Sequence, residues 1–131
     1  MMLFEAIRDD DGDTEVRFHG KPIDPERSLC IRSHCASHYD WGTVSQATAQ
    51  LALAMLMELL PVRAAEVLYE RFAGEVLRVL PHRGWRFPAD HVLAWVDQQA
   101  THHKEAKEAG AIIRELYVRD DKRSGGPASV N

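Results

Sequence analysis

The chain has 131 residues, 45% hydrophobic and 27% charged, which is the composition of a soluble globular protein and excludes global disorder. A chain of this length fits one domain that folds without disulfides or metal ions. The net charge is −4 and no segment carries the dense Lys/Arg stripe of a nucleic-acid surface, so binding of DNA or RNA is disfavoured.

The longest apolar stretch, Leu51 to Met57, is much shorter than the roughly 20 residues that a transmembrane helix needs. The start of the chain, MMLFEAIRDDDGD, has too short an apolar run and too many acidic residues for a secretory signal. We therefore expect no membrane association and a cytoplasmic location, in which Cys30 and Cys35 are reduced thiols.

The first predicted elements are two short strands, residues 2–8 and 14–18, which are joined by the turn sequence DDDGD. The segment 28–32 is compatible with a third short strand. We therefore expect residues 1–32 to form a β-hairpin or a small antiparallel sheet.

A long helix is predicted for residues 46–60, with Thr43 or Ser45 as its N-cap and Pro61 after its end. It is apolar on almost every side, so other elements must surround it and it should lie at the centre of the fold. A second helix is predicted to run from Pro61 to about residue 80, because its apolar residues recur at intervals of three and four. The short link between the two helices favours an antiparallel pair.

After the second helix we expect a turn at residues 81–84, and residues 85–88 then lead into a third helix over about 89–99. A fourth, amphipathic helix is predicted for about residues 103–118.

The predicted fold class is therefore α+β, with a hairpin or small antiparallel sheet packed on a bundle of three to four helices. Residues 1–118 would form a single compact domain, whose helical part covers residues 46–118. The remaining segment, 119–131, is polar and rich in glycine and serine, and is predicted to be a disordered tail.

Four side chains that can bind metal ions lie within nine residues, namely Cys30, His34, Cys35 and His38. Zinc sites combine cysteine with histidine, but structural sites usually take their ligands in pairs from two distant elements. We therefore expect small thiols and hydrogen-bonded histidines here, with no cofactor. A zinc-binding module or a Cys/His enzyme remains the alternative, although no third orienting residue and no oxyanion turn is recognisable.

Tyr39, Asp40 and Trp41 are the candidates for contact with a protein partner. Tyrosine and tryptophan offer a large contact area together with a polar group, and they lie here in a loop next to Gly42. The structural alternative is that these rings close one end of the helical core.

Several short motifs occur in a characteristic order: Ser33-His34, Trp41-Gly42, Ala49-Gln50-Leu51-Ala52-Leu53-Ala54, Tyr69, Phe72 and Gly84-Trp85. This pattern resembles that of a small family of bacterial, plasmid and phage proteins classified as a domain of unknown function. Family members tend to carry a Gly-Gly-Ser-Gly-Pro connection where this chain has Thr43 to Thr48, which puts an anion site at the helix N-terminus in doubt. The resemblance implies a compact protein of accessory genomes and no particular reaction.

We expect a non-enzymatic protein that binds another protein, through the Tyr39–Trp41 loop or through the acidic N-terminal hairpin. The family resemblance suggests an accessory protein of a mobile genetic element that blocks a host defence complex. Besides the Cys/His alternative, a homodimer formed through the apolar stripe of the helix at 103–118 is a third hypothesis.

Overall fold

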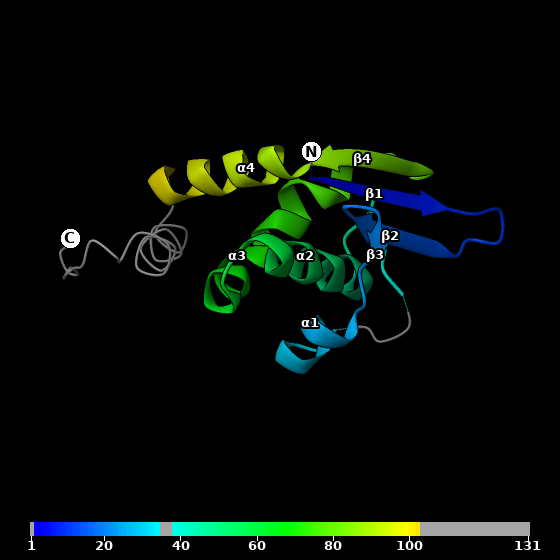
Figure 1. Cartoon of the computed structure of the whole chain (residues 1–131), viewed down its shortest axis with the longest axis horizontal. Coiled ribbons are helices and arrows are strands. Elements are labelled where there is room, and N and C mark those ends of the chain that lie inside the picture. The colour runs from blue at the N-terminus through cyan, green and yellow to red at the C-terminus, as the bar shows by residue number, and fades with distance from the viewer. Residues whose placement is uncertain (1, 35–37, 103–131) are drawn as a thin grey trace.

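The computed structural model describes residues 2–34 and 38–102, and it has the predicted α+β class (Figure 1). The strands of this part are β1 (Leu3–Arg8), β2 (Thr14–Phe18), β3 (Lys21–Pro22) and β4 (Gly84–Pro88). Its helices are α1 (Glu26–Ile31), α2 (Gln46–Leu59), α3 (Val62–Glu75) and α4 (Ala89–His102), with the short 3-10 helix η1 (Leu77–Val79) after α3.

The strands form one antiparallel sheet in the order β3-β2-β1-β4. The predicted hairpin of β1 and β2 is present, and its turn is stabilised by Asp9, whose carboxylate accepts hydrogen bonds from the backbone N–H groups of Asp11 and Asp13. Gly12 has a φ of 89°, a conformation that glycine adopts without strain. β4 pairs with the other side of β1, so β1 is a central strand although it begins the chain.

Two expectations about the strands are wrong. Residues 28–32 do not form a strand, because the segment after Pro25 turns into helix α1, in which Ser28 is buried and donates a hydrogen bond to the carbonyl of Pro25 at 3.0 Å. The segment expected only to lead into a helix, residues 85–88, belongs to strand β4. Its alternation is short and ends at Pro88, so the periodicity is weak in the sequence.

The predicted central helix is α2. The Oγ of Ser45 accepts a hydrogen bond from the backbone N–H of Thr48 at 3.1 Å, which confirms Ser45 as the N-cap. All residues from Leu51 to Met57 are buried. The second predicted helix is shorter than expected: α3 ends at Glu75 and η1 follows it.

The third predicted helix is present as α4, which runs to His102. The predicted helix over 103–118 and the tail over 119–131 lie outside the described residues. No helix in the part of the chain that the structure describes combines the length and the hydrophobicity required to cross a bilayer.

Helices α1, α2 and α3 lie on one side of the sheet, whereas α4 extends from the end of β4 beyond it (Figure 1). The side chains on that face are buried, among them Phe4, Ala6, Val16 and Trp85. Since side chains alternate along a strand, the opposite face carries the residues between them. We call this second surface the outer sheet face and define it by Glu5, Ile7, Glu15, Arg17 and Arg86, together with Arg83, which precedes β4 and lines the same hollow.

Candidate functional site

The first predicted binding residue, Trp41, is part of the core. Its side chain is 1% exposed, and its indole N–H donates to the carbonyl oxygens of Pro81 at 2.9 Å and His82 at 3.0 Å. The ring also packs edge to face against Trp85, with 5.7 Å between the ring centroids. An indole with both its ring and its N–H engaged inside the protein has a packing role.

Arg8 and Asp40 complete the surroundings of Trp41. The Arg8 guanidinium lies 4.7 Å from the centre of the Trp41 ring, donates to the carbonyl of His82 and forms a 2.7 Å ion pair with Asp40. The same carboxylate oxygen of Asp40 accepts the backbone N–H of Trp41 at 2.8 Å. We call this group the Trp41 clamp, consisting of Arg8, Asp40, Trp41, His82 and Trp85.

Tyr39 is also buried, and its hydroxyl donates to the carbonyl of Ile23 at 3.3 Å. Burial raises the pKa of the Tyr39 hydroxyl well above its ordinary value, and the charges of Asp24 and Glu58 raise it further. Protein binding by the loop of Tyr39 and Trp41 stays a prediction, but both aromatic rings serve the core and do not form an exposed surface.

Three of the four predicted metal ligands, Cys30, His34 and His38, lie in the described residues. Cys30 is an exposed thiol on α1, His38 is exposed in the following loop, and Cys35 lies outside the described residues. Among residues 2–34 and 38–102, no group of three or more His, Cys, Asp or Glu side chains has an arrangement that could hold a metal ion.

His34 lies instead in a hydrogen-bonded cluster between α2 and α3. Its ring Nδ1 is 2.8 Å from Oε1 of Gln46, and its Nε2 is 2.6 Å from the Tyr69 hydroxyl. An amide oxygen only accepts, so in the neutral ring Nδ1 carries the proton and Nε2 accepts from Tyr69. Both ring nitrogens are therefore used within the protein.

Two further residues belong to this arrangement. Gln50 is fully buried, and its amide accepts the backbone N–H of His34 at 2.6 Å and donates to Ser28 at 2.8 Å. The carboxylate of Glu70 lies 3.5 Å from the Tyr69 hydroxyl. We call this group the His34 cluster, consisting of His34, Gln46, Gln50, Tyr69 and Glu70.

The pKa of the Tyr69 hydroxyl is raised, mainly by burial and then by the charge of Glu70. The hydroxyl therefore keeps the proton that it donates to His34. A cavity of about 470 Å³ adjoins the cluster between the N-terminal end of α2 and the C-terminal half of α3.

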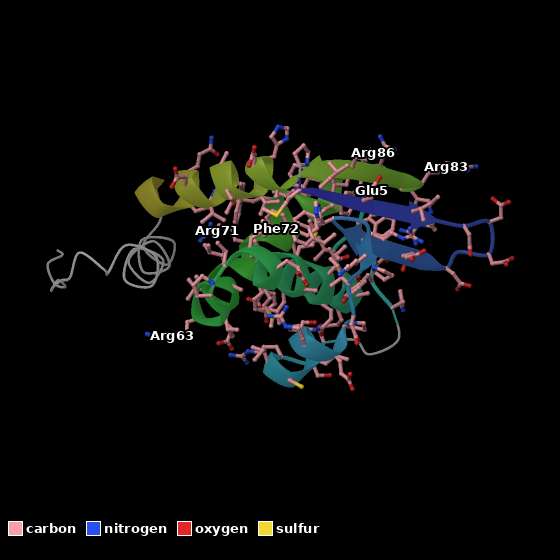
Figure 2. All side chains as sticks on the ribbon, viewed as in Figure 1. Glu5, Arg63, Arg71, Phe72, Arg83 and Arg86 are labelled. Carbon is pink, nitrogen blue, oxygen red and sulfur yellow. The ribbon has the colours of Figure 1, made fainter. Side chains whose placement is uncertain are left out.

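The outer sheet face carries a larger hollow of about 740 Å³. Figure 2 shows Glu5, Arg83 and Arg86 along β1 and β4 on this side of the sheet. Arg86 is 3.3 Å from Glu5, and Arg17 is 3.0 Å from Glu15, but these pairs are exposed. Water screens the attraction within an exposed ion pair, so the pair is weak. Its charged groups therefore remain accessible to a partner.

β4 is an edge strand of the sheet. β1 lies on one side of it, and the described part of the chain has no strand on its other side. The N–H of Arg8 donates to the carbonyl of Arg83, and the N–H of Ala89 donates to the carbonyl of Met2. Since hydrogen-bonded residues alternate along an antiparallel pair, these two bonds determine which residues of β4 face β1.

Trp85 and Phe87 direct their backbone N–H and C=O groups toward β1. Gly84 and Arg86 direct theirs away from the sheet. Pro88 has no N–H, so it limits the length of the free edge. The result is a short strand edge with backbone donors and acceptors available at two residues.

Neither the edge strand β4 nor the His34 cluster is predicted by the sequence analysis. The alternation of Trp85 and Phe87 with Gly84 and Arg86 is a signal for a strand, but it covers only five residues. The partners of His34 could not be paired from the sequence, because they lie on two helices that only the fold brings together.

One comparison with known proteins bears on this chain. The model of a family of unknown function, DUF6166, matches residues 4–98. The chain belongs to this family. The DUF6166 segment begins in β1 and ends in α4, so it contains the Trp41 clamp, the His34 cluster and the outer sheet face. A search of curated proteins finds no match to the chain, and a search of solved structures finds none either.

Proposed function

We propose that this DUF6166 protein is a non-enzymatic protein that binds a partner protein by accepting an extended segment at the free edge of β4. The observation that carries the proposal is the outward direction of the Gly84 and Arg86 backbone. An extended peptide gains main-chain hydrogen bonds at such an edge, and its alternate side chains contact the adjoining face. The proposed setting, a cytoplasmic accessory protein of a mobile element that blocks a host defence complex, rests on the family resemblance.

The partner segment that fits this edge is acidic. The outer sheet face has three arginines, Arg17, Arg83 and Arg86, against the carboxylates of Glu5 and Glu15. Within the described residues, no carboxylate lies within ion-pair distance of Arg83. A carboxylate from a partner would complete the charges of this face and could bind arginine in a bidentate manner.

The same face offers a contact for an apolar side chain. Ile7 is 62% exposed and stands opposite Gly84, which has no side chain to cover it. A Cβ at Gly84 would lie 2.5 Å from the carbonyl oxygen of Ala6, so this gap cannot be filled by a larger residue without moving the backbone. The favoured partner segment therefore alternates acidic and aliphatic residues.

A second copy of the chain fits this edge less well. Pairing β4 with β4 of another copy would bring the same arginines toward each other, and facing like charges destabilise a strand pair. Dimer formation through this edge would contradict the proposal of an acidic partner segment.

The experiment uses a short synthetic peptide that alternates Glu with Val, and a matched peptide that alternates Lys with Val. Binding is followed by amide hydrogen exchange and by calorimetry on the full chain. We expect the Glu peptide to bind and to slow exchange at Gly84 and Arg86, and the Lys peptide not to bind.

Two variants separate backbone pairing from charge. Arg86→Pro removes the outward N–H and leaves the bonds of Trp85 and Phe87 to β1 intact, whereas Arg86→Ser removes the charge and keeps the N–H. We expect Arg86→Pro to abolish binding and Arg86→Ser only to weaken it. Equal binding by Arg86→Pro and the wild type, or a native mass that shows a dimer abolished by Arg86→Pro, would overturn the proposal of an acidic partner at this edge.

A further inference from the structure

The cavity next to the His34 cluster has an apolar floor made of small residues. The cavity is lined by Ala49 of α2, by Ala73 and Gly74 of α3, and by Val44, which has 70% of its surface exposed. A Cβ at Gly74 would meet no atom within 4 Å, so the space over this residue is open. A short aliphatic chain fits such a floor. Its binding would remove apolar surface of both the chain and the floor from water, and it would leave no polar group without a hydrogen bond.

The polar side of the cavity consists mainly of hydrogen-bond acceptors. Glu70 supplies an exposed carboxylate, Gln46 an amide oxygen that already accepts from His34, and Ser45 a hydroxyl that already accepts the backbone N–H of Thr48. Among the described residues, Glu70 has no Lys, Arg or His partner within ion-pair distance. A ligand with N–H donors and a positive charge would complement the charge of Glu70 and the remaining lone pairs of Gln46 and Ser45.

The walls of the cavity are held in place by the His34 cluster. His34 connects the loop after α1 to Gln46 on α2 and to Tyr69 on α3, at 2.8 Å and 2.6 Å. Its backbone N–H is bound by the buried Gln50. The site is therefore formed before a ligand arrives, which reduces the entropy lost on binding.

We propose that this cavity binds an alkylammonium group, with the aliphatic chain on Ala49, Ala73 and Gly74 and the ammonium at Glu70. The group is either a small free amine or the side chain of a lysine on another protein. The site is separate from the edge of β4, and its test is independent of the proposed function.

The test is an NMR titration of the labelled full chain with n-butylammonium, with N-acetyl-lysine N-methylamide, and with 1-butanol as the uncharged control. We expect saturable shifts of the Ala49 and Gly74 amides with the ammonium probes and none with butanol. Binding of both ammonium probes supports a lysine side chain as the source. Binding of butylammonium alone supports a free amine.

Three variants make the assignment specific. Glu70→Gln should weaken butylammonium binding by roughly threefold to fivefold, because the ion pair that it removes is exposed to water. Gly74→Leu should abolish binding by filling the cavity, while leucine favours the helix and preserves the fold. Glu66→Gln makes the same change of charge one turn earlier on α3 and should leave the affinity unchanged.

Two results would overturn the proposal. One is the absence of saturable shifts with butylammonium in the folded wild type. The other is an affinity that stays the same in Glu70→Gln and Gly74→Leu.

Discussion

The two faces of the sheet use the same kind of ion pair in different surroundings. On the inner face, Arg8 and Asp40 are 2.7 Å apart and their side chains are only 12% and 22% exposed. On the outer face, Arg86 and Glu5 are 3.3 Å apart, and the Arg86 side chain is 77% exposed. Arg8 and Glu5 come from the same strand, so the difference arises from the side of the pleat on which each residue lies.

This contrast shows which charged residues support the fold and which are available for recognition. The inner pair is connected to Trp41 by a hydrogen bond and a cation–π contact, so its loss would leave polar groups unpaired. The outer pair can be solvated when it separates, and it exchanges partners at little cost. The predictions below measure this difference between the faces.

The largest effect is expected for Trp41→Ala. Removal of a fully buried indole creates a cavity and leaves the carbonyl of Pro81 without its donor, so the free energy of unfolding should fall by about 3–5 kcal/mol. Urea denaturation followed by circular dichroism measures the loss. A decrease below about 1 kcal/mol would contradict the core role assigned to Trp41.

Arg8→Ala should follow, with a loss of about 2–3 kcal/mol in the free energy of unfolding. This variant removes the ion pair to Asp40, the hydrogen bond to His82 and the contact with the Trp41 ring. A double-mutant cycle with Asp40→Ala gives the coupling between the two residues. Additive losses in that cycle would mean that the inner pair is no stronger than a surface pair.

Alkaline pH provides a third test of the inner side. The native pKa of Tyr39 is raised, so above the ordinary tyrosine pKa of about 10 the unfolded chain loses its proton first. Stability should therefore be unaffected by this group below that pH and should fall as the pH rises beyond it. Tyr39→Phe should lose about 1 kcal/mol at neutral pH, because the bond to Ile23 is absent, but should decline less steeply in alkali.

The measurement is the midpoint of urea unfolding at several pH values from neutral to alkaline. The raised pKa of Tyr69 acts in the same direction, so Tyr69→Phe serves as the companion variant and the double variant should show the shallowest decline. Parallel pH curves for the wild type and Tyr39→Phe would contradict the burial of this hydroxyl.

The smallest effect is expected on the outer face. Arg86→Ala should change the free energy of unfolding by less than about 1 kcal/mol, since its pair with Glu5 is exposed. The comparison with Arg8→Ala under identical conditions is the measurement. If Arg8→Ala and Arg86→Ala lower the free energy of unfolding by the same amount, burial is not the factor that distinguishes the two faces.

Much of the local structure could be predicted because it depends on neighbouring residues. The hairpin follows from the Asp-rich turn with Gly12, and α2 follows from its apolar run and the Ser45 cap. The missed strand β4 is stabilised by its pairing with β1, in which Phe4 stands opposite Phe87. A pairing between such distant segments leaves only a weak local pattern.

The candidate sites were harder to predict than the fold. Cys30, His34 and His38 suggested a metal site by proximity in the chain, yet in the fold His34 is bound to Gln46 and Tyr69 on two different helices. Tyr39 and Trp41 suggested a surface by residue type, yet both are buried. Residue type indicates what a side chain can do, whereas its environment depends on which elements pack around it.

The sequence by itself determined the α+β class, the central position of α2 and the hairpin, because hydrophobic periodicity, caps and turns act over a few residues. Only the tertiary structure decided that β4 forms an edge of the sheet beside β1, that Arg8 faces Trp41 while Arg86 faces solvent, and that His34 meets Tyr69. These choices depend on contacts between distant segments, whose energies appear only when the chain is folded and water has been removed from between them.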